Sequence, residues 1–92
     1  MTQLPTTVVI SPDALHQVVE GEAVLFHLTR QCYYSLDDVG SRIWSLLVVG
    51  ENPEAIVAIL LDEYDTTEPV LRADVGSLLN RLGEAGLIEL TP

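Results

Sequence analysis

Residues 25–47, LFHLTRQCYYSLDDVGSRIWSLL, constrain the fold more than any other part of the chain. The stretch begins with one strand, and a short connection leads to a second strand at residues 32–36, where tyrosines favour a pleated, half-buried backbone. Asp37 and Asp38 follow, and either can cap a helix because a carboxylate accepts the free N–H groups of a first turn. Apolar residues then recur with helical spacing at Val39, Ile43, Leu46 and Leu47, with Trp44 beside them. The stretch therefore predicts a strand that runs directly into an amphipathic helix.

Another hairpin leads into this stretch and shares its first strand. Residues 15–20 and 23–28 flank Gly21-Glu22, a two-residue loop of the Gly-X type that favours a II′ turn. Together with residues 32–36 they predict a three-stranded antiparallel meander. Residues 6–10 are β-branched and follow a proline, so we expect a short strand there, which could pair alongside the meander at an edge.

Two more helices are predicted after the first, which ends at Gly50. Asn52 and Pro53 start the second helix, and residues 65–67 end it and supply a cap for the third. The expected buried face of the second helix is Ile56, Ile59, Leu60 and Tyr64, and that of the third is Leu71, Val75, Leu78, Leu79 and Leu82. Residues 87–90 form an apolar tail, either a final strand or a cover for the core. Strands followed by helices predict one α+β domain over residues 1–92, with the inventory of a winged helix.

The charge balance limits the possible partners. Acidic residues outnumber basic ones 14 to 4, which gives a net charge of −10, and the chain has no lysine. Nucleic-acid binding depends on basic side chains that displace counterions, so this surface favours a neutral or basic partner instead. The lone Cys32 excludes an internal disulfide and is typical of a reducing compartment. Residues 1–13 lack a signal-peptide pattern and no apolar run is long enough to span a bilayer, so we expect a cytoplasmic protein without membrane contact.

Few side chains are arranged for chemistry. His16, His27 and Cys32 lack the spacing of a zinc site, so we expect no metal, with the histidines at polar strand positions and the cysteine as a small buried residue. The acidic pairs stand at helix ends, where capping and solvation explain them. The sequence has no phosphate-binding glycine loop, nucleophile elbow or dinucleotide fingerprint. The pattern indicates neither an enzyme nor a cofactor-binding protein.

Two features go beyond what a small folded domain needs. Tyr33 and Tyr34 lie on the last strand of the meander, an expected edge whose free N–H and C=O groups could pair with an added strand. The third helix carries more aliphatic side chains than one sheet face covers, and Leu78, on the side of Asp74 and Arg81, is expected to be only partly covered. An edge strand beside an apolar helix forms a groove for an extended peptide. The alternative, that these residues simply fill a thin core, stays equally open on physical grounds.

Several short motifs occur in the order and spacing of a known family. They are GEAVLFHL at residues 21–28, Arg30, YYSL at residues 33–36, VGSRIW at residues 39–44, IVAILLDEYD at residues 56–65 and VGSLLNRLGEAGLI at residues 75–88. In these motifs the chain resembles the PqqD family, small proteins also called RiPP recognition elements, which bind precursor leader peptides. A free-standing, acidic chain of this size is most similar to the leader-binding protein of lasso-peptide clusters, which works beside a separate leader peptidase and a cyclase.

The resemblance implies a winged-helix-like fold of three antiparallel strands followed by three helices. It also implies that a leader peptide adds as a strand to the third strand and lies on the third helix. The implied peptide-binding residues are Cys32, Tyr33, Tyr34, Ser35 and Leu36 on the strand, and Leu71, Asp74, Val75, Leu78 and Leu79 on the helix. The family usually has a glycine between the second and third strands, where this chain has residues 29–31, Thr-Arg-Gln.

The implied function is non-catalytic binding of the leader and delivery of the precursor to the peptidase and the cyclase. The alternative is a winged-helix regulator that binds nucleic acid. The third helix disfavours it, because its only basic residues are Arg72 and Arg81 and they lie among acidic ones. We expect a monomer, or a weak homodimer paired through the exposed edge strand.

Overall fold

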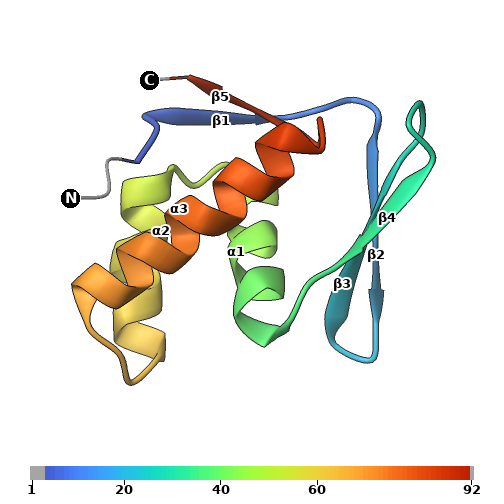
Figure 1. Ribbon diagram of the computed structural model, residues 1–92. Helices are drawn as coiled ribbons and strands as arrows, with labels where there is room; N and C mark the ends of the chain where they lie inside the picture. Colours follow the sequence, from blue (N-terminus) through green and yellow to red (C-terminus); the bar gives the residue numbers. More distant parts are fainter. Residues whose placement is uncertain (1–3, 92) are drawn as a thin grey trace.

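A computed structural model describes residues 4–91, which form five strands and three helices (Figure 1). In chain order these are β1 Thr7–Ile10, β2 Ala14–Val19, β3 Glu22–His27, β4 Cys32–Ser35, α1 Asp38–Val48, α2 Pro53–Glu63, α3 Glu68–Glu84 and β5 Ile88–Thr91. The predicted α+β, winged-helix-like fold is confirmed, because an antiparallel sheet of order β2–β3–β4 precedes the three helices. None of the helices in this part of the chain has the length and apolar character needed to cross a membrane.

The first strand belongs to a second, two-stranded sheet. β1 pairs antiparallel with β5, from Thr7 opposite Thr91 to Ile10 opposite Ile88. The expectation that residues 6–10 could lie alongside the three-stranded sheet is therefore wrong, whereas the apolar tail does form a final strand. This pairing gives one edge of each end segment a hydrogen-bonding partner, and Ile10 packs against the core.

The first hairpin turn lies one residue earlier than predicted. Val19 pairs with Glu22, so the turn residues are Glu20 and Gly21, with φ angles of 53° and 84°. Positive φ at both positions is the pattern of a I′ turn, so the predicted II′ turn is wrong. In the β3–β4 loop, Gln31 has a φ of 55°. A glutamine thus adopts the left-handed conformation in the segment where the resembling family usually has a glycine.

The junction between β4 and α1 forms as the sequence predicts. Asp37 caps α1, since its carboxylate accepts a hydrogen bond from the Gly40 N–H at 2.7 Å. One side chain then ties three elements together. The Ser41 hydroxyl accepts from the Ala23 N–H at 2.8 Å and donates to the Leu36 carbonyl at 3.2 Å. The start of β3 and the end of β4 are thereby fixed to the first turns of α1.

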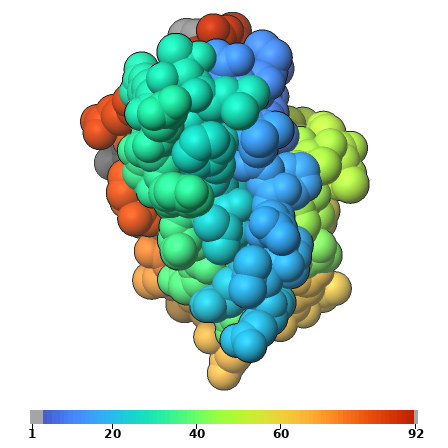
Figure 2. Space-filling model, turned by 90° about the vertical axis from the view of Figure 1, so that its right-hand side faces the viewer, coloured from blue at the N-terminus to red at the C-terminus, as the bar shows by residue number. Residues whose placement is uncertain are grey.

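The core lies between the inner face of the β2–β3–β4 sheet and the three helices. The five aliphatic residues predicted for the buried face of α3 are all buried, whereas Val70 of the same helix is exposed. Leu78 is only 4% exposed, so the expectation that it would be partly covered is wrong. The reason is that α3 packs against α2, α1 and β5 and is covered from several sides. No helix of residues 4–91 covers the outer face of the sheet, and Figure 2 looks onto this face, with the blue to green atoms of β2, β3 and β4 in front.

Candidate functional site

β4 is an edge strand, as predicted, because within residues 4–91 it pairs with β3 alone. The Leu36 N–H, just past its end, donates to the Ala23 carbonyl of β3 at 2.9 Å. Hydrogen-bonding direction alternates along an antiparallel strand, so Tyr34 also faces β3 with its backbone groups. Tyr33 and Ser35 point their N–H and C=O groups away from β3, where an added strand can reach them.

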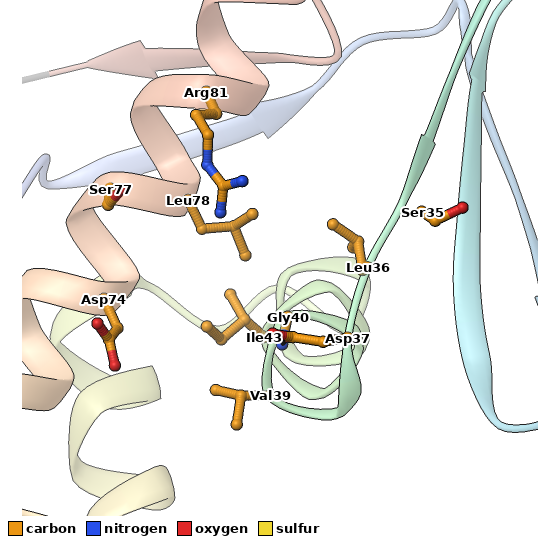
Figure 3. Close-up of a pocket in the computed structure, with 10 residues that line it drawn as sticks. All are labelled: Ser35, Leu36, Asp37, Val39, Gly40, Ile43, Asp74, Ser77, Leu78 and Arg81. Carbon is orange, nitrogen blue, oxygen red and sulfur yellow. Dashed lines mark hydrogen bonds between the residues drawn. The ribbon is translucent and has the colours of Figure 1, made fainter.

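A groove runs beside this edge, and its opposite wall is α3 (Figure 3). One part of it, about 410 Å³, lies at the end of β4 and the start of α1, and a second part of about 320 Å³ continues toward the start of β4. The two parts share Ser35, Leu36, Leu78 and Arg81, and together they are named the β4–α3 groove. Leu78 and the guanidinium of Arg81 extend from α3 toward Leu36 and Ile43 (Figure 3).

Apolar and charged residues together line the groove. The first part is lined by Ser35, Leu36, Asp37, Val39, Gly40, Ile43, Asp74, Ser77, Leu78 and Arg81. The second part adds Arg30, Tyr34, Leu82, Glu84 and Ala85. The floor is therefore apolar, and the rim carries charges of both signs.

Half of the residues implied by the resemblance line this groove: Tyr34, Ser35, Leu36, Asp74 and Leu78. The side chain of Tyr33 is 72% exposed and packs on Phe26 with 4.9 Å between ring centroids, on the outer face of the sheet. Cys32, at the start of β4, is half-buried. The remaining three, Leu71, Val75 and Leu79, are buried in the core and do not line the groove.

Other lining residues were not among the implied binding residues. The sequence placed Arg81 on the same side of α3 as Asp74 and Leu78, which it follows by about two helical turns and nearly one turn, but did not assign it to binding. Arg30 has no such local signal. Its guanidinium donates to the Glu84 carbonyl at 2.9 Å and lies against Gly86, where a Cβ would come within 2.9 Å of the Arg30 Cζ. This contact joins the β3–β4 loop to the end of α3 and closes one end of the groove.

A few polar side chains of the groove are engaged in contacts within the protein. The Tyr34 hydroxyl lies 4.0 Å from the Cys32 sulfur, and this hydrogen bond is the main cause that raises the pKa of Tyr34 above its ordinary value. The Asp37 carboxylate is held by its role as helix cap. The groove thus offers backbone groups, an apolar floor and a few charges.

The soft ligands of the sequence do not form a cluster. In the part of the chain that the structure describes, no three His, Cys, Asp or Glu side chains could together hold a metal ion. His27 is buried, and its Nδ1 accepts a hydrogen bond from the Arg30 N–H at 3.1 Å. His16 packs edge-on against Trp44, with 5.9 Å between ring centroids. Both histidines thus have structural contacts.

A different hollow, of about 530 Å³, lies between β2 and α1. Its lining is mainly apolar and includes Val18, Trp44 and Val48. The Trp44 Nε1 is buried and has no hydrogen-bond partner among residues 4–91. Since β2 is the other edge of the sheet, this hollow is the second candidate surface for binding an extended chain.

Comparisons with known proteins point to one family. The model of coenzyme PQQ synthesis protein D (PqqD) matches residues 22–88. A solved structure of TbiB1 in complex with the TbiA(beta) leader peptide is 40% identical, with a TM-score of 0.85, over 88% of this chain and 94% of that one. A solved structure of lasso peptide synthetase B1 complexed with the leader peptide has the same fold at 22% identity, with a TM-score of 0.83, over 90% and 98% of the two chains. Among curated proteins, no sequence matches.

Proposed function

This chain belongs to the PqqD family, and from that premise we propose that it binds the leader peptide of a ribosomally made precursor, of the lasso-peptide kind, without catalysing a reaction itself. One observation carries the proposal. This chain is 40% identical to a protein solved with its leader peptide, and its own edge strand has outward N–H and C=O groups directly beside a groove with an apolar floor. Addition of a strand to a sheet edge is a general way to hold an extended peptide.

In the proposed complex, the leader pairs with the backbone of Tyr33 and Ser35 and lies in the β4–α3 groove. Every second side chain of an added strand faces the groove, because side chains alternate along a strand. The apolar side chains of the leader contact Tyr34, Leu36 and Leu78, while Asp74 meets a polar or basic one. Cys32 extends the pairing edge. Leu71, Val75 and Leu79 act indirectly, by fixing α3 on the core.

The proposal includes the partners and the place of action. The bound precursor is presented to a separate leader peptidase and then to a cyclase, in the cytoplasm, by a monomer or a weak homodimer of one 92-residue domain. Two features support a binding role rather than a catalytic one. The groove has buried apolar residues such as Leu36, Ile43 and Leu78 at its floor, and Asp37, a carboxylate within it, is held as a helix cap.

The nucleic-acid alternative has little support. Of the two arginines on α3, Arg72 is paired with Glu54 at 2.7 Å and with Glu68 at 3.2 Å. A recognition helix needs free basic side chains for phosphates and bases, and the net charge of −10 opposes the approach of a polyanion.

Calorimetric titration tests the proposed function. The probe is the leader segment of the precursor that the protein is proposed to bind, named here the cognate leader. We expect saturable binding with one leader per protein, and no cleavage of the precursor by the protein alone in a mass-spectrometric assay. Folded protein that shows no heat of binding at high micromolar leader would refute leader binding, and cleavage by the purified protein would refute the non-catalytic role.

A further inference from the structure

Arg81 is the one arginine without a partner in the described part of the chain. Arg42 pairs with Glu63 at 2.6 Å, Arg72 pairs with two glutamates, and Arg30 donates to a backbone carbonyl. With 14 acidic and 4 basic residues in the sequence, carboxylates are abundant, yet Arg81 forms neither an ion pair nor a hydrogen bond within residues 4–91. It is exposed, and it lines both parts of the β4–α3 groove.

The charges along the groove are unevenly distributed. At the end of β4, the lining carboxylates are Asp37 and Asp74, and Arg81 reaches this part from α3. At the start of β4, Arg30 and Arg81 face a single carboxylate, that of Glu84. One end of the groove is therefore negative and the other positive.

The spacing of these charges matches an extended peptide. Asp74 and Arg81 are seven residues apart on α3, which corresponds to a rise of about 10 Å at 1.5 Å per residue. A strand covers this distance in about three residues. Because side chains on one face of a strand are separated by even numbers, the two partner side chains stand two or four positions apart.

The order of the two partners follows from the sheet. β4 runs from the Arg81 end of the groove to the Asp74 end, and it belongs to an antiparallel sheet. A strand that continues the antiparallel pattern runs the opposite way. From its N-terminus, the added strand therefore passes Asp74 first and Arg81 afterwards.

We propose that Arg81 and Asp74 set the register and direction of the bound leader: Arg81 binds an acidic side chain, and Asp74 binds a basic side chain two or four positions before it. This inference rests on the proposed function, because it concerns the same groove. The ligand class that it names is an extended segment with a cation followed by a carboxylate on one face. The overall acidity of the protein alone would favour only basic residues, so the demand for one carboxylate is specific to Arg81.

A charge-reversal cycle tests the proposal. Each acidic residue of the cognate leader is changed to lysine in turn, and each peptide is titrated by fluorescence anisotropy against wild-type protein and Arg81→Glu. We expect one acidic position whose change weakens binding to wild type by roughly three- to tenfold and is rescued by Arg81→Glu, as expected for a direct charge pair. The same scan of basic residues to glutamate, against Asp74→Lys, should find its rescued position two or four residues earlier.

Controls separate the register from general charge effects. Arg81→Gln and Asn80→Asp each lower the net charge by one, and Asn80 is exposed on α3 outside the groove. Only Arg81→Gln should lose the preference for the acidic leader position. Binding of the wild type without any position coupled to Arg81 would overturn this inference and leave the proposed function standing. If the basic leader residue coupled to Asp74 came after the acidic leader residue coupled to Arg81, the antiparallel direction would be overturned. No binding at all would refute the proposed function itself.

Discussion

Ser35 is the residue at which binding and folding can be separated most clearly. Its N–H and C=O point to the open edge of β4, whereas those of its neighbour Tyr34 face β3. The two residues are adjacent and both exposed, and their backbone groups point in opposite directions. They form a matched pair for testing strand addition.

Ser35→Pro should weaken binding of the cognate leader at least about tenfold while changing stability little, because it removes an N–H that only an added strand uses. Tyr34→Pro should instead destabilise the fold by about 1–3 kcal/mol, since it removes a ladder donor to β3. Thermal melts and calorimetric titrations of both variants provide the comparison. Normal leader affinity in Ser35→Pro would place the binding edge elsewhere.

Leu78 and Leu79 form a second matched pair. Both are buried on α3, but only Leu78 lines the groove. Either change to alanine should cost about 2–5 kcal/mol of stability, as for other buried leucines. Leu78→Ala should in addition lose about 1–2 kcal/mol of leader affinity, measured at a temperature where both variants are folded. Equal leader affinities of the two variants would mean that the bound leader does not contact Leu78.

At the scale of elements, local signals predicted the helices well. Asn52 caps α2 by accepting from the Ala55 N–H at 2.8 Å, and Gly50 ends α1 with a φ of 94°. These helix ends depend only on residues within one turn, so they can be predicted from the sequence. The strand order of the meander, and hence the edge at β4, followed from two short connections.

What could not be predicted depends on contacts between distant segments. β1 and β5 come from opposite ends of the described chain, and neither strand carries a local mark of its partner. The turn between β2 and β3 lies one residue earlier than predicted because Glu20 adopts a positive φ, which its residue type does not favour. The groove wall formed by Arg30 and Ile43 exists only once the loop and α1 pack near α3. The burial of Leu78 likewise reflects neighbours outside its own helix.

The α1–α2 contact should depend on pH through one ion pair. Arg42 holds the carboxylate of Glu63 at 2.6 and 2.9 Å, and this hydrogen bonding lowers the pKa of Glu63 below its ordinary value of 4.5. A lowered folded-state pKa stabilises the fold above the unfolded value, and this contribution is lost as pH falls through the folded value. The melting difference between wild type and Glu63→Gln should therefore be larger at pH 7 than at an acidic pH well below 4.5. Because the pair is exposed, the difference should be small. An equal difference at both pH values would mean that the charge of Glu63 is not the cause.

At the scale of the whole molecule, the net charge of −10 acts on encounter more than on the final complex. Raising salt from about 0.05 M to about 0.5 M should slow association with a neutral-to-basic leader, because it shortens the reach of the protein's field. Dissociation should change less. Stopped-flow fluorescence measures both rates, and association rates that do not change with salt would exclude electrostatic steering.

The central claim is that the leader pairs with the β4 edge. Amide hydrogen exchange followed by NMR, with and without the cognate leader, tests it most directly. The account predicts that the leader protects the outward amides of Tyr33 and Ser35 and shifts the signals of Leu78 and Arg81, while the Trp44 indole N–H is unchanged. Protection along β2 together with a shift of the Trp44 indole, and no change at Tyr33 or Ser35, would contradict it and assign binding to the hollow between β2 and α1.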